Sequence, residues 1–128
     1  MPARSEPAPP GEERKAAIVA KAALRAAAAL KIPNRLLARI IGLSEASVSR
    51  AAQGAFQLDP DSKPYELALL FVRLFRSLDA IVGGDAATAA GWIRADNIVL
   101  GAKPLDLMQH VPGLTDVIAY LDARRAVV

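Results

Sequence analysis

The chain has 128 residues, contains no cysteine and only one histidine, and carries a formal net charge of +3. This length allows one domain or two very small ones. The absence of cysteine excludes disulfide scaffolds, thiolate zinc sites, iron–sulfur clusters and a cysteine nucleophile. His110 alone forms neither a metal cage nor a catalytic triad. We therefore expect a protein that is not an enzyme and that binds neither a metal nor a cofactor.

The composition predicts an all-α protein. Hydrophobic residues make up 53% of the chain and aromatic residues only 5%. Most of the excess is alanine, which is the strongest helix former and is depleted in strands. Charged residues interrupt every apolar stretch before it reaches the roughly 18 residues of a membrane span. The first residues also lack the apolar run of a secretory signal. We expect a soluble protein that is located in the cytoplasm.

Positive charge is concentrated in the first half of the chain. Residues 1–60 contain nine Lys and Arg against five Asp and Glu, whereas residues 61–128 contain seven against eight. A basic half is compatible with a nucleic-acid phosphate backbone as partner. A solvated helix face shows the same bias, so charge alone leaves the partner open.

The chain begins with a segment that disfavours regular structure. Residues 1–11 include four prolines and Gly11, which predicts a disordered arm. An amphipathic helix is predicted from Glu12 to about Lys31, because apolar and basic residues alternate there at helical spacing. Pro33 ends this pattern, since proline lacks an N–H and restricts the residue before it.

Two short helices joined by a glycine turn are predicted next. Asn34 is the expected N-cap of a helix that ends at Ile41, and Gly42 suits the turn. Ser44 is the expected cap of the following helix, which Gly54 closes. This pattern is typical of a helix-turn-helix, whose second helix enters the major groove of DNA.

The outward residues of the second short helix are the candidate base-reading residues. Arginine pairs with guanine, glutamine pairs with adenine, and serine contacts bases or phosphates. Arg35 and Arg39 follow Lys31 at four-residue steps and are expected to contact phosphates. The other predicted DNA contacts are Ser44, Glu45, Ser47, Ser49, Arg50 and Gln53. The alternative is a helical pair used only for packing.

A change in composition over residues 55–64 marks the predicted domain boundary, because acidic residues and prolines gather there. We expect the arm at 1–11, a DNA-binding domain at 12–58 and a second helical domain at 59–128. The apolar helix predicted over 65–82 must lie in a core. Shorter elements follow: a helix capped by Asp85 that ends at Ile93, a loop over 95–103, a turn that begins at Pro104 and a helix over 114–125.

The second domain resembles a known family. The sequence reads Trp92-Ile93-Arg94-Ala95-Asp96-Asn97-Ile98-Val99-Leu100-Gly101-Ala102-Lys103-Pro104-Leu105-Asp106-Leu107-Met108, and Gly113 and Val117 follow. This resembles the toxin-binding domain of Xre/MbcA/ParS-type antitoxins, with its Asn, Leu-Gly-Gly-x-x-Pro-Leu and Gly-x-x-x-Val elements. Ala102 departs from the second glycine of that pattern. With the helix-turn-helix, the resemblance covers about residues 15–125.

The resemblance implies a type II antitoxin with two partners. It would neutralise a RES-domain toxin, an NAD-consuming enzyme, by occluding its active site, and it would repress its own operon. Symmetric operators are read by dimers, so we expect a homodimer within a larger hetero-oligomer. The expected toxin contacts are Trp92, Asn97, Leu100, Gly101, Pro104, Leu105, Arg124 and Arg125.

The physical interpretation of these contacts has two parts. The segment from Asp96 to Gly101 is expected to form an extended, rigid ridge, while Trp92 serves mainly as a core anchor. Arg124 and Arg125 would approach the toxin's anionic dinucleotide site or merely complement a helix dipole. Two other functions stay open: a transcriptional regulator without a toxin, and a toxin-binding protein whose helix-turn-helix is vestigial.

Overall fold

The structure is a computed structural model that describes residues 10–127. These residues form seven α-helices and no strand, which confirms the all-α prediction. The helices are α1 (Pro10–Ala29), α2 (Asn34–Ile41), α3 (Glu45–Ala52), α4 (Lys63–Ile81), α5 (Ala86–Arg94), α6 (Pro104–Leu107) and α7 (Val111–Val127). Within this range, no helix combines the length and apolarity that would let it cross a membrane.

The first helix begins earlier than the sequence predicted. Pro10 and Gly11, which the predicted arm included, belong to α1. Proline fits the first turn of a helix because its missing N–H has no partner there in any case. Most of the predicted arm, residues 1–9, lies outside the described residues.

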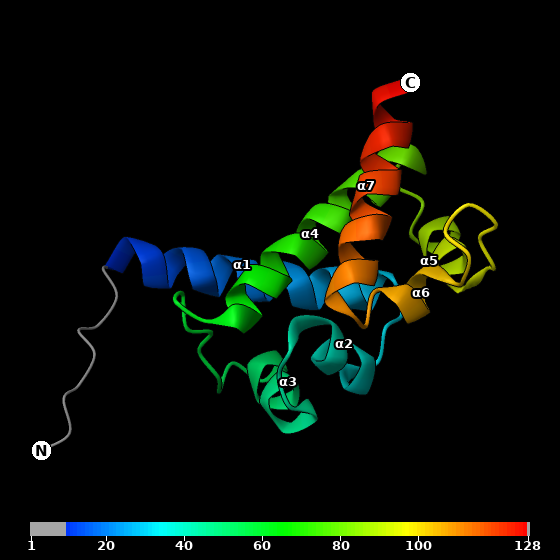
Figure 1. Ribbon diagram of the computed structural model, residues 1–128. Helices are drawn as coiled ribbons and strands as arrows, with labels where there is room; N and C mark the ends of the chain where they lie inside the picture. Colours follow the sequence, from blue (N-terminus) through cyan, green and yellow to red (C-terminus); the bar gives the residue numbers. More distant parts are fainter. Residues whose placement is uncertain (1–9, 128) are drawn as a thin grey trace, which may run out of the picture.

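Helix α4 is the centre of the fold. Figure 1 shows α1 crossing α4, α2 and α3 lying together below them, and α7 standing against α4. Phe71, Leu74 and Leu78 of α4 are fully buried, as expected for a helix that contacts neighbours on several sides. The prediction that this helix lies in the core is confirmed, although it begins at Lys63 rather than Tyr65.

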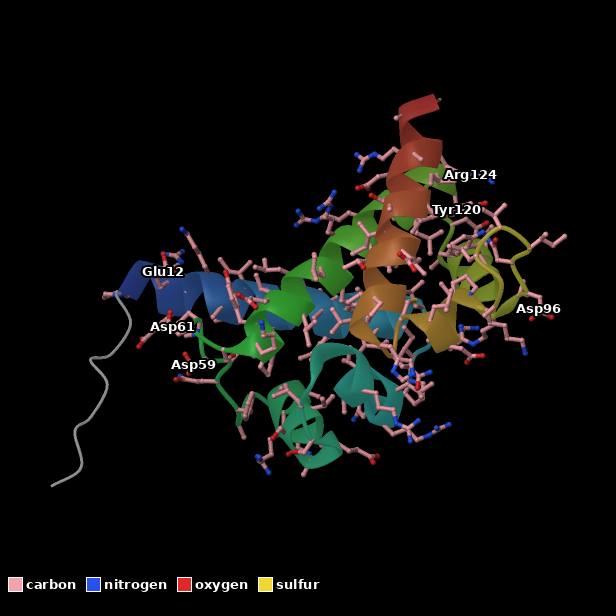
Figure 2. All side chains as sticks on the ribbon, viewed as in Figure 1. Glu12, Asp59, Asp61, Asp96, Tyr120 and Arg124 are labelled. Carbon is pink, nitrogen blue, oxygen red and sulfur yellow. The ribbon has the colours of Figure 1, made fainter. Side chains whose placement is uncertain are left out.

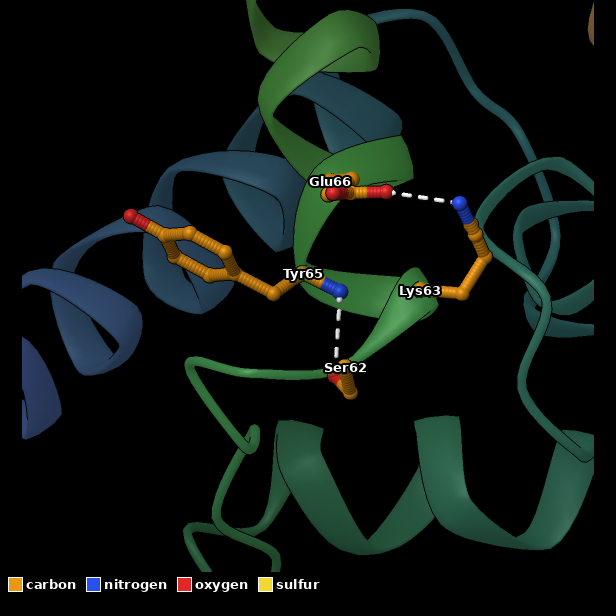
Figure 3. Close-up of polar contacts among 4 residues, drawn as sticks. All are labelled: Ser62, Lys63, Tyr65 and Glu66. Atoms are coloured by element: carbon orange, nitrogen blue, oxygen red, sulfur yellow. Dashed lines mark hydrogen bonds and ion pairs between the residues drawn. The ribbon is translucent and has the colours of Figure 1, made fainter. Parts of the chain in front are cut away.

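The first turn of α4 is fixed by local polar contacts. Ser62 is the N-cap, and its Oγ accepts a hydrogen bond from the backbone N–H of Tyr65 at 3.3 Å. Lys63 Nζ lies 2.9 Å from Glu66 Oε2 (Figure 3). The cap satisfies an orphan helix donor and fixes where α4 starts.

Arg94 joins α5 to the end of α1. Its Nη1 donates to the carbonyl of Leu30 at 2.8 Å, and its Nη2 donates to the carbonyl of Lys31 at 2.7 Å. Helix ends leave carbonyls without intrahelical partners, so Arg94 acts as a cap supplied by a distant helix. The connection ties the start of the helix-turn-helix to the second half of the chain.

Helix α7 also begins earlier than predicted. The sequence suggested a start at Leu114, with Pro112 and Gly113 as a break, but α7 begins at Val111 and includes both residues. Gly113 is buried, and a Cβ built there would lie 2.1 Å from the carbonyl oxygen of Leu107. Glycine is therefore required at position 113 because α6 and α7 approach each other closely there, and not because the helix breaks.

Candidate functional site

The turn between α2 and α3 has the predicted glycine geometry. Gly42 has φ 74° and ψ 31°, a left-handed conformation that side chains disfavour. A Cβ built on Gly42 would also lie 3.2 Å from Cδ1 of Leu67. The backbone N–H of Leu43 donates to the carbonyl of Ala38 at 3.0 Å and closes the helix end. The turn thus packs directly against α4.

Helix α3 is capped at both ends as predicted. Ser44 Oγ accepts from the backbone N–H of Ser47 at 3.0 Å. At the other end Gly54 is left-handed, with φ 76°, and the N–H of Ala55 donates to the carbonyl of Arg50 at 2.8 Å. Val48 is buried and holds α3 against the core. A short helix is positioned firmly by these contacts, which suits a recognition helix.

The predicted DNA contacts lie on the solvent side of α2 and α3, and we call them the recognition surface. Ser47 and Ser49 are half-buried, and the exposed members are Arg35, Arg39, Ser44, Glu45, Arg50 and Gln53. Ser44 Oγ donates to Ser47 Oγ at 2.9 Å, and Arg50 Nη2 donates to Ser47 Oγ at 3.0 Å. This chain of hydroxyls orients the Arg50 guanidinium before any ligand binds.

The predicted cap of α2 is wrong. Pro33 is the N-cap, with extended φ −70° and ψ 160°, and Asn34 is the first helical residue. The Asn34 amide instead donates to Ser49 Oγ at 3.3 Å. Because proline already holds the extended conformation of a cap, Asn34 is free to link α2 to α3.

Arg39 connects the recognition surface to the second half of the chain. Its Nη1 donates to Oε1 of Gln109 at 3.4 Å, and Gln109 Nε2 donates to the carbonyl of Leu105 at 3.2 Å. The contact reaches from α2 to the segment between α6 and α7. It complements the Arg94 contact, which joins the same two halves.

The loop before α6 is a closed turn, so the predicted extended ridge is wrong. Asn97 and Ala102 form an isolated bridge, and the N–H of Gly101 donates to the Asn97 carbonyl at 2.8 Å. Asn97 Oδ1 also accepts from the N–H of Leu100 at 3.0 Å. Asparagine side chains stabilise turns in this way. Left-handed Gly101, with φ 82°, completes the turn.

Two apolar side chains project from the tip of this turn. Ile98 is 98% exposed and Val99 is 77% exposed, while Leu100 packs partly against the core. The sequence analysis did not single out Ile98 or Val99. The available signal was a pair of β-branched residues placed between Asn97 and Gly101.

An aromatic and cationic cluster lies beside the turn. Trp92 and Tyr120 stack, with ring centroids 6.0 Å apart and an interplanar angle of 19°. Arg124 Nη1 donates to Tyr120 Oη at 2.9 Å, and Arg124 Cζ lies 5.7 Å from the ring centroid. Figure 2 shows Tyr120 and Arg124 on the side of α7 that faces α5. The hydrogen bond from Arg124, and a weaker one from Asn97, lower the pKa of Tyr120.

We call this region the loop surface, formed by Trp92, Asn97, Ile98, Val99, Tyr120 and Arg124. It unites three predicted toxin contacts: Trp92, Asn97 and Arg124. Trp92 is half-buried, so it supports the surface as well as packing inward. Tyr120 was missed by the sequence analysis, although its spacing of four residues from Arg124 places the two side chains on one face of a helix.

Five predicted toxin contacts are not among the six residues of the loop surface. Leu100 is half-buried and Gly101 is exposed, and both belong to the turn itself. Pro104 and Leu105 are buried, so they support α6 from inside and are not available at the surface. Arg125 lines a groove with residues of α1 and α4. Successive residues of a helix point about 100° apart, so adjacent arginines diverge. Within residues 10–127, no group of His, Asp and Glu is arranged to hold a metal ion.

The architecture defines an all-α protein with a helix-turn-helix and a second helical domain. Comparison with protein families gives two matches. The antitoxin Xre-like helix-turn-helix domain matches residues 10–73, and the antitoxin Xre/MbcA/ParS C-terminal toxin-binding domain matches residues 77–126. The chain therefore belongs to the Xre/MbcA/ParS family of antitoxins. A search of curated proteins gives no significant match.

The two family matches divide the chain inside α4. The first match ends at residue 73 and the second begins at residue 77, whereas the sequence analysis placed the division at residues 58 and 59. Helix α4 contacts α1 and α2 as well as α5 and α7. Helices of both family domains thus pack against α4.

Proposed function

We propose that this antitoxin neutralises a RES-domain toxin by covering the active site in which the toxin consumes NAD. The loop surface is the proposed contact. It lies within residues 77–126, which match the toxin-binding domain. We further propose that the protein is located in the cytoplasm, where it binds its operator DNA through the recognition surface and represses its own operon.

The observation that carries the proposal is the exposed apolar tip of the rigid turn. Ile98 is almost entirely in solvent and Val99 is largely exposed, while Asn97 hydrogen-bonds the backbone beneath them. A turn whose backbone is already held in place loses little backbone conformational entropy on binding. Apolar side chains at its tip supply much of the binding energy when they enter a pocket on a partner.

Arg124 supplies the positive charge of the same surface. It is exposed and is held by Tyr120 through a hydrogen bond and the face of the ring. A site that processes an anionic dinucleotide must offer groups that attract negative charge or leave room for it. We propose that Arg124 enters the space of the dinucleotide phosphates and that Ile98 and Val99 bind outside it.

The recognition surface supports the proposed repression. Arg50 is oriented by Ser47, and Arg35 and Arg39 supply positive charge on α2. Arginine in the major groove reads guanine through two hydrogen bonds, whereas phosphate contacts set position. We propose that a homodimer binds a two-fold symmetric operator, with one α3 in each half-site.

Co-expression with the neighbouring reading frame tests the proposal. The antitoxin is purified through a tag, and the intact complex is weighed by native mass spectrometry. We expect a stable hetero-oligomer whose partner consumes NAD once it is released. A homodimer that binds its own promoter, but no protein partner, would support a stand-alone regulator instead.

A charge reversal tests the role of Arg124 within the complex. Arg124→Glu is expected to weaken inhibition of NAD consumption by the purified toxin. Arg35→Glu makes the same charge change on the recognition surface and is the matched control. Equal inhibition by both variants would contradict the proposed placement of Arg124.

A further inference from the structure

A groove of about 620 Å³ runs between α1, α4 and α7, apart from the loop surface. Its apolar lining includes Ile18 and Val19 of α1 and Leu69 and Leu70 of α4. Ile18 is 59% exposed and Leu69 is 42% exposed. Exposed apolar side chains that line a groove together mark an interaction site more often than scattered ones do.

The rest of the lining is predominantly basic. Arg73, Arg76 and Arg125 face the groove together with Asp122. Asp122 accepts hydrogen bonds from Ser77 Oγ at 2.9 Å and from Arg73. These contacts, led by the one from Ser77, lower the pKa of Asp122, so this carboxylate is charged at neutral pH.

Asp122 offsets only part of the positive charge. Its ion pair is with Arg73, and within the described part of the chain neither Arg76 nor Arg125 forms an ion pair. The groove therefore has an apolar lining and, among the described residues, two guanidinium groups that form no ion pair, those of Arg76 and Arg125. Arg125 is near enough to Asp122 to contribute to the lowered pKa of that carboxyl. A segment that fills the groove needs apolar side chains on one face and carboxylates beside them.

A second copy of the chain is a poor occupant by this criterion. A two-fold symmetric contact places the same patch on both subunits. Each groove brings Arg76 and Arg125 without an ion pair and one carboxylate that Arg73 already binds, so a second groove offers these arginines no free carboxylate. Charge complementarity favours an acidic partner.

We propose that the groove binds an acidic, amphipathic segment of the toxin, a proposal that rests on the function proposed above. The apolar side chains of the segment pack on Ile18 and Leu69, and its carboxylates pair with Arg76 and Arg125. Tyr120 and Arg124 lie on the opposite side of α7 from Asp122, since residues two apart on a helix point about 200° apart, and Arg125 points about 100° away from Arg124. The toxin thus holds α7 from two sides.

This position brings the toxin against both family domains. Ile18 and Leu69 belong to the helix-turn-helix match, and Asp122 and Arg125 belong to the toxin-binding match. A segment in the groove would therefore contact residues of the helix-turn-helix domain directly. The loop surface alone offers no such contact, because its residues all belong to the toxin-binding match.

Toxin affinity of groove variants tests the inference. Arg76→Glu and, separately, Leu69→Ser are expected to raise the Kd for the purified toxin by about 10-fold or more, as loss of an interface anchor does. Both positions are at the surface, so helical content measured by circular dichroism should match the parent protein. Arg35→Glu repeats the charge reversal on α2 and should leave the Kd unchanged. For Arg76→Glu the difference should shrink at high salt.

A photocrosslinker at position 69 identifies the occupant. Leu69 is replaced by benzoylphenylalanine, the complex is irradiated, and the crosslinked peptide is sequenced by mass spectrometry. A crosslink to an acidic segment of the toxin supports the inference. A crosslink to a second antitoxin chain, or parent-like Kd values for both groove variants, overturns it while leaving the proposed function intact. If the parent protein binds no toxin, the proposed function itself fails.

Discussion

The recognition surface and the loop surface hold their exposed side chains in different ways. On the recognition surface, Ser47 connects Ser44 to Arg50 through hydrogen bonds. On the loop surface, hydrogen bonds fix the backbone, and Ile98 and Val99 stand free in solvent. The first arrangement suits a charged, polar partner, and the second suits a partner with an apolar pocket. One small fold thus presents two distinct chemistries of recognition.

The largest expected effect comes from the contact between α6 and α7. Gly113→Ala places a methyl group 2.1 Å from the Leu107 carbonyl oxygen, so α6 must move away from α7. We expect a loss of about 3 kcal/mol or more in the free energy of unfolding, because overpacking against backbone is poorly accommodated. Toxin binding should fall with it. Thermal unfolding and calorimetric titration measure both effects.

Gly91→Ala is the matched control. Gly91 is a helical residue of α5, and a Cβ built there meets nothing within 4 Å. Alanine should stabilise the helix by about 0.5–1 kcal/mol. Destabilisation by both substitutions would show that the close contact at Gly113 is not the cause.

Removal of the apolar side chains at the tip of the turn should impair the loop surface and leave the recognition surface unchanged. We expect the Ile98→Ser, Val99→Ser double variant to lose about 2 kcal/mol or more of toxin-binding energy, which is roughly 30-fold in Kd. Both side chains are exposed, so the unfolding temperature and operator affinity should be unchanged. Val111→Ser, at another exposed apolar position, should leave toxin binding intact. Toxin affinity equal to that of the parent protein would refute the role of the turn.

Two arginines distinguish base reading from phosphate contact on the recognition surface. Arg50→Ala is expected to cost about 1–3 kcal/mol of operator affinity and to relax sequence preference at one position. Arg35→Ala should weaken all sequences alike and reduce the salt dependence of binding by about one unit of slope. Salt titrations against operator and scrambled DNA measure both. The assignment fails if Arg50→Ala weakens both DNAs equally.

The smallest expected effect is a pH dependence in the groove. Ser77 and Arg73 lower the pKa of Asp122 in the folded protein. The stabilisation from Asp122 is therefore present above the unfolded pKa, near 3.8, and is lost as the pH falls through the lower folded pKa. The difference in unfolding free energy between the parent and Asp122→Asn should be small near neutral pH. This difference in unfolding free energy should shrink further below pH about 4. A difference that persists there would show that the charge of Asp122 is not its cause.

Local signals made the helix-turn-helix predictable from sequence. Gly42, Ser44 and Gly54 act on their own backbone or on neighbours a few residues away. The α2 cap was assigned wrongly because Pro33 competes for the same position as Asn34. Propensity alone does not rank these two residues, since each suits a helix start for a different reason.

The second half depends more on contacts between distant segments. Gly113 looked like a helix break, but its role is set by the approach of Leu107. The loop surface needs Tyr120 to lie against Trp92, and no local pattern predicts that pairing. The groove likewise exists only because α1, α4 and α7 meet. Family resemblance located the toxin-binding domain, while its available surface had to come from the fold.

Inhibition of NAD consumption by the purified toxin tests the separation of the two surfaces most directly. Toxin is titrated with the parent antitoxin, with the Ile98→Ser, Val99→Ser variant and with an Arg35→Glu, Arg50→Ala variant. We predict that the recognition-surface variant inhibits as well as the parent, whereas the loop variant leaves the toxin active at the same concentration. Full inhibition by the loop variant, or loss of inhibition by the recognition-surface variant, would contradict the account.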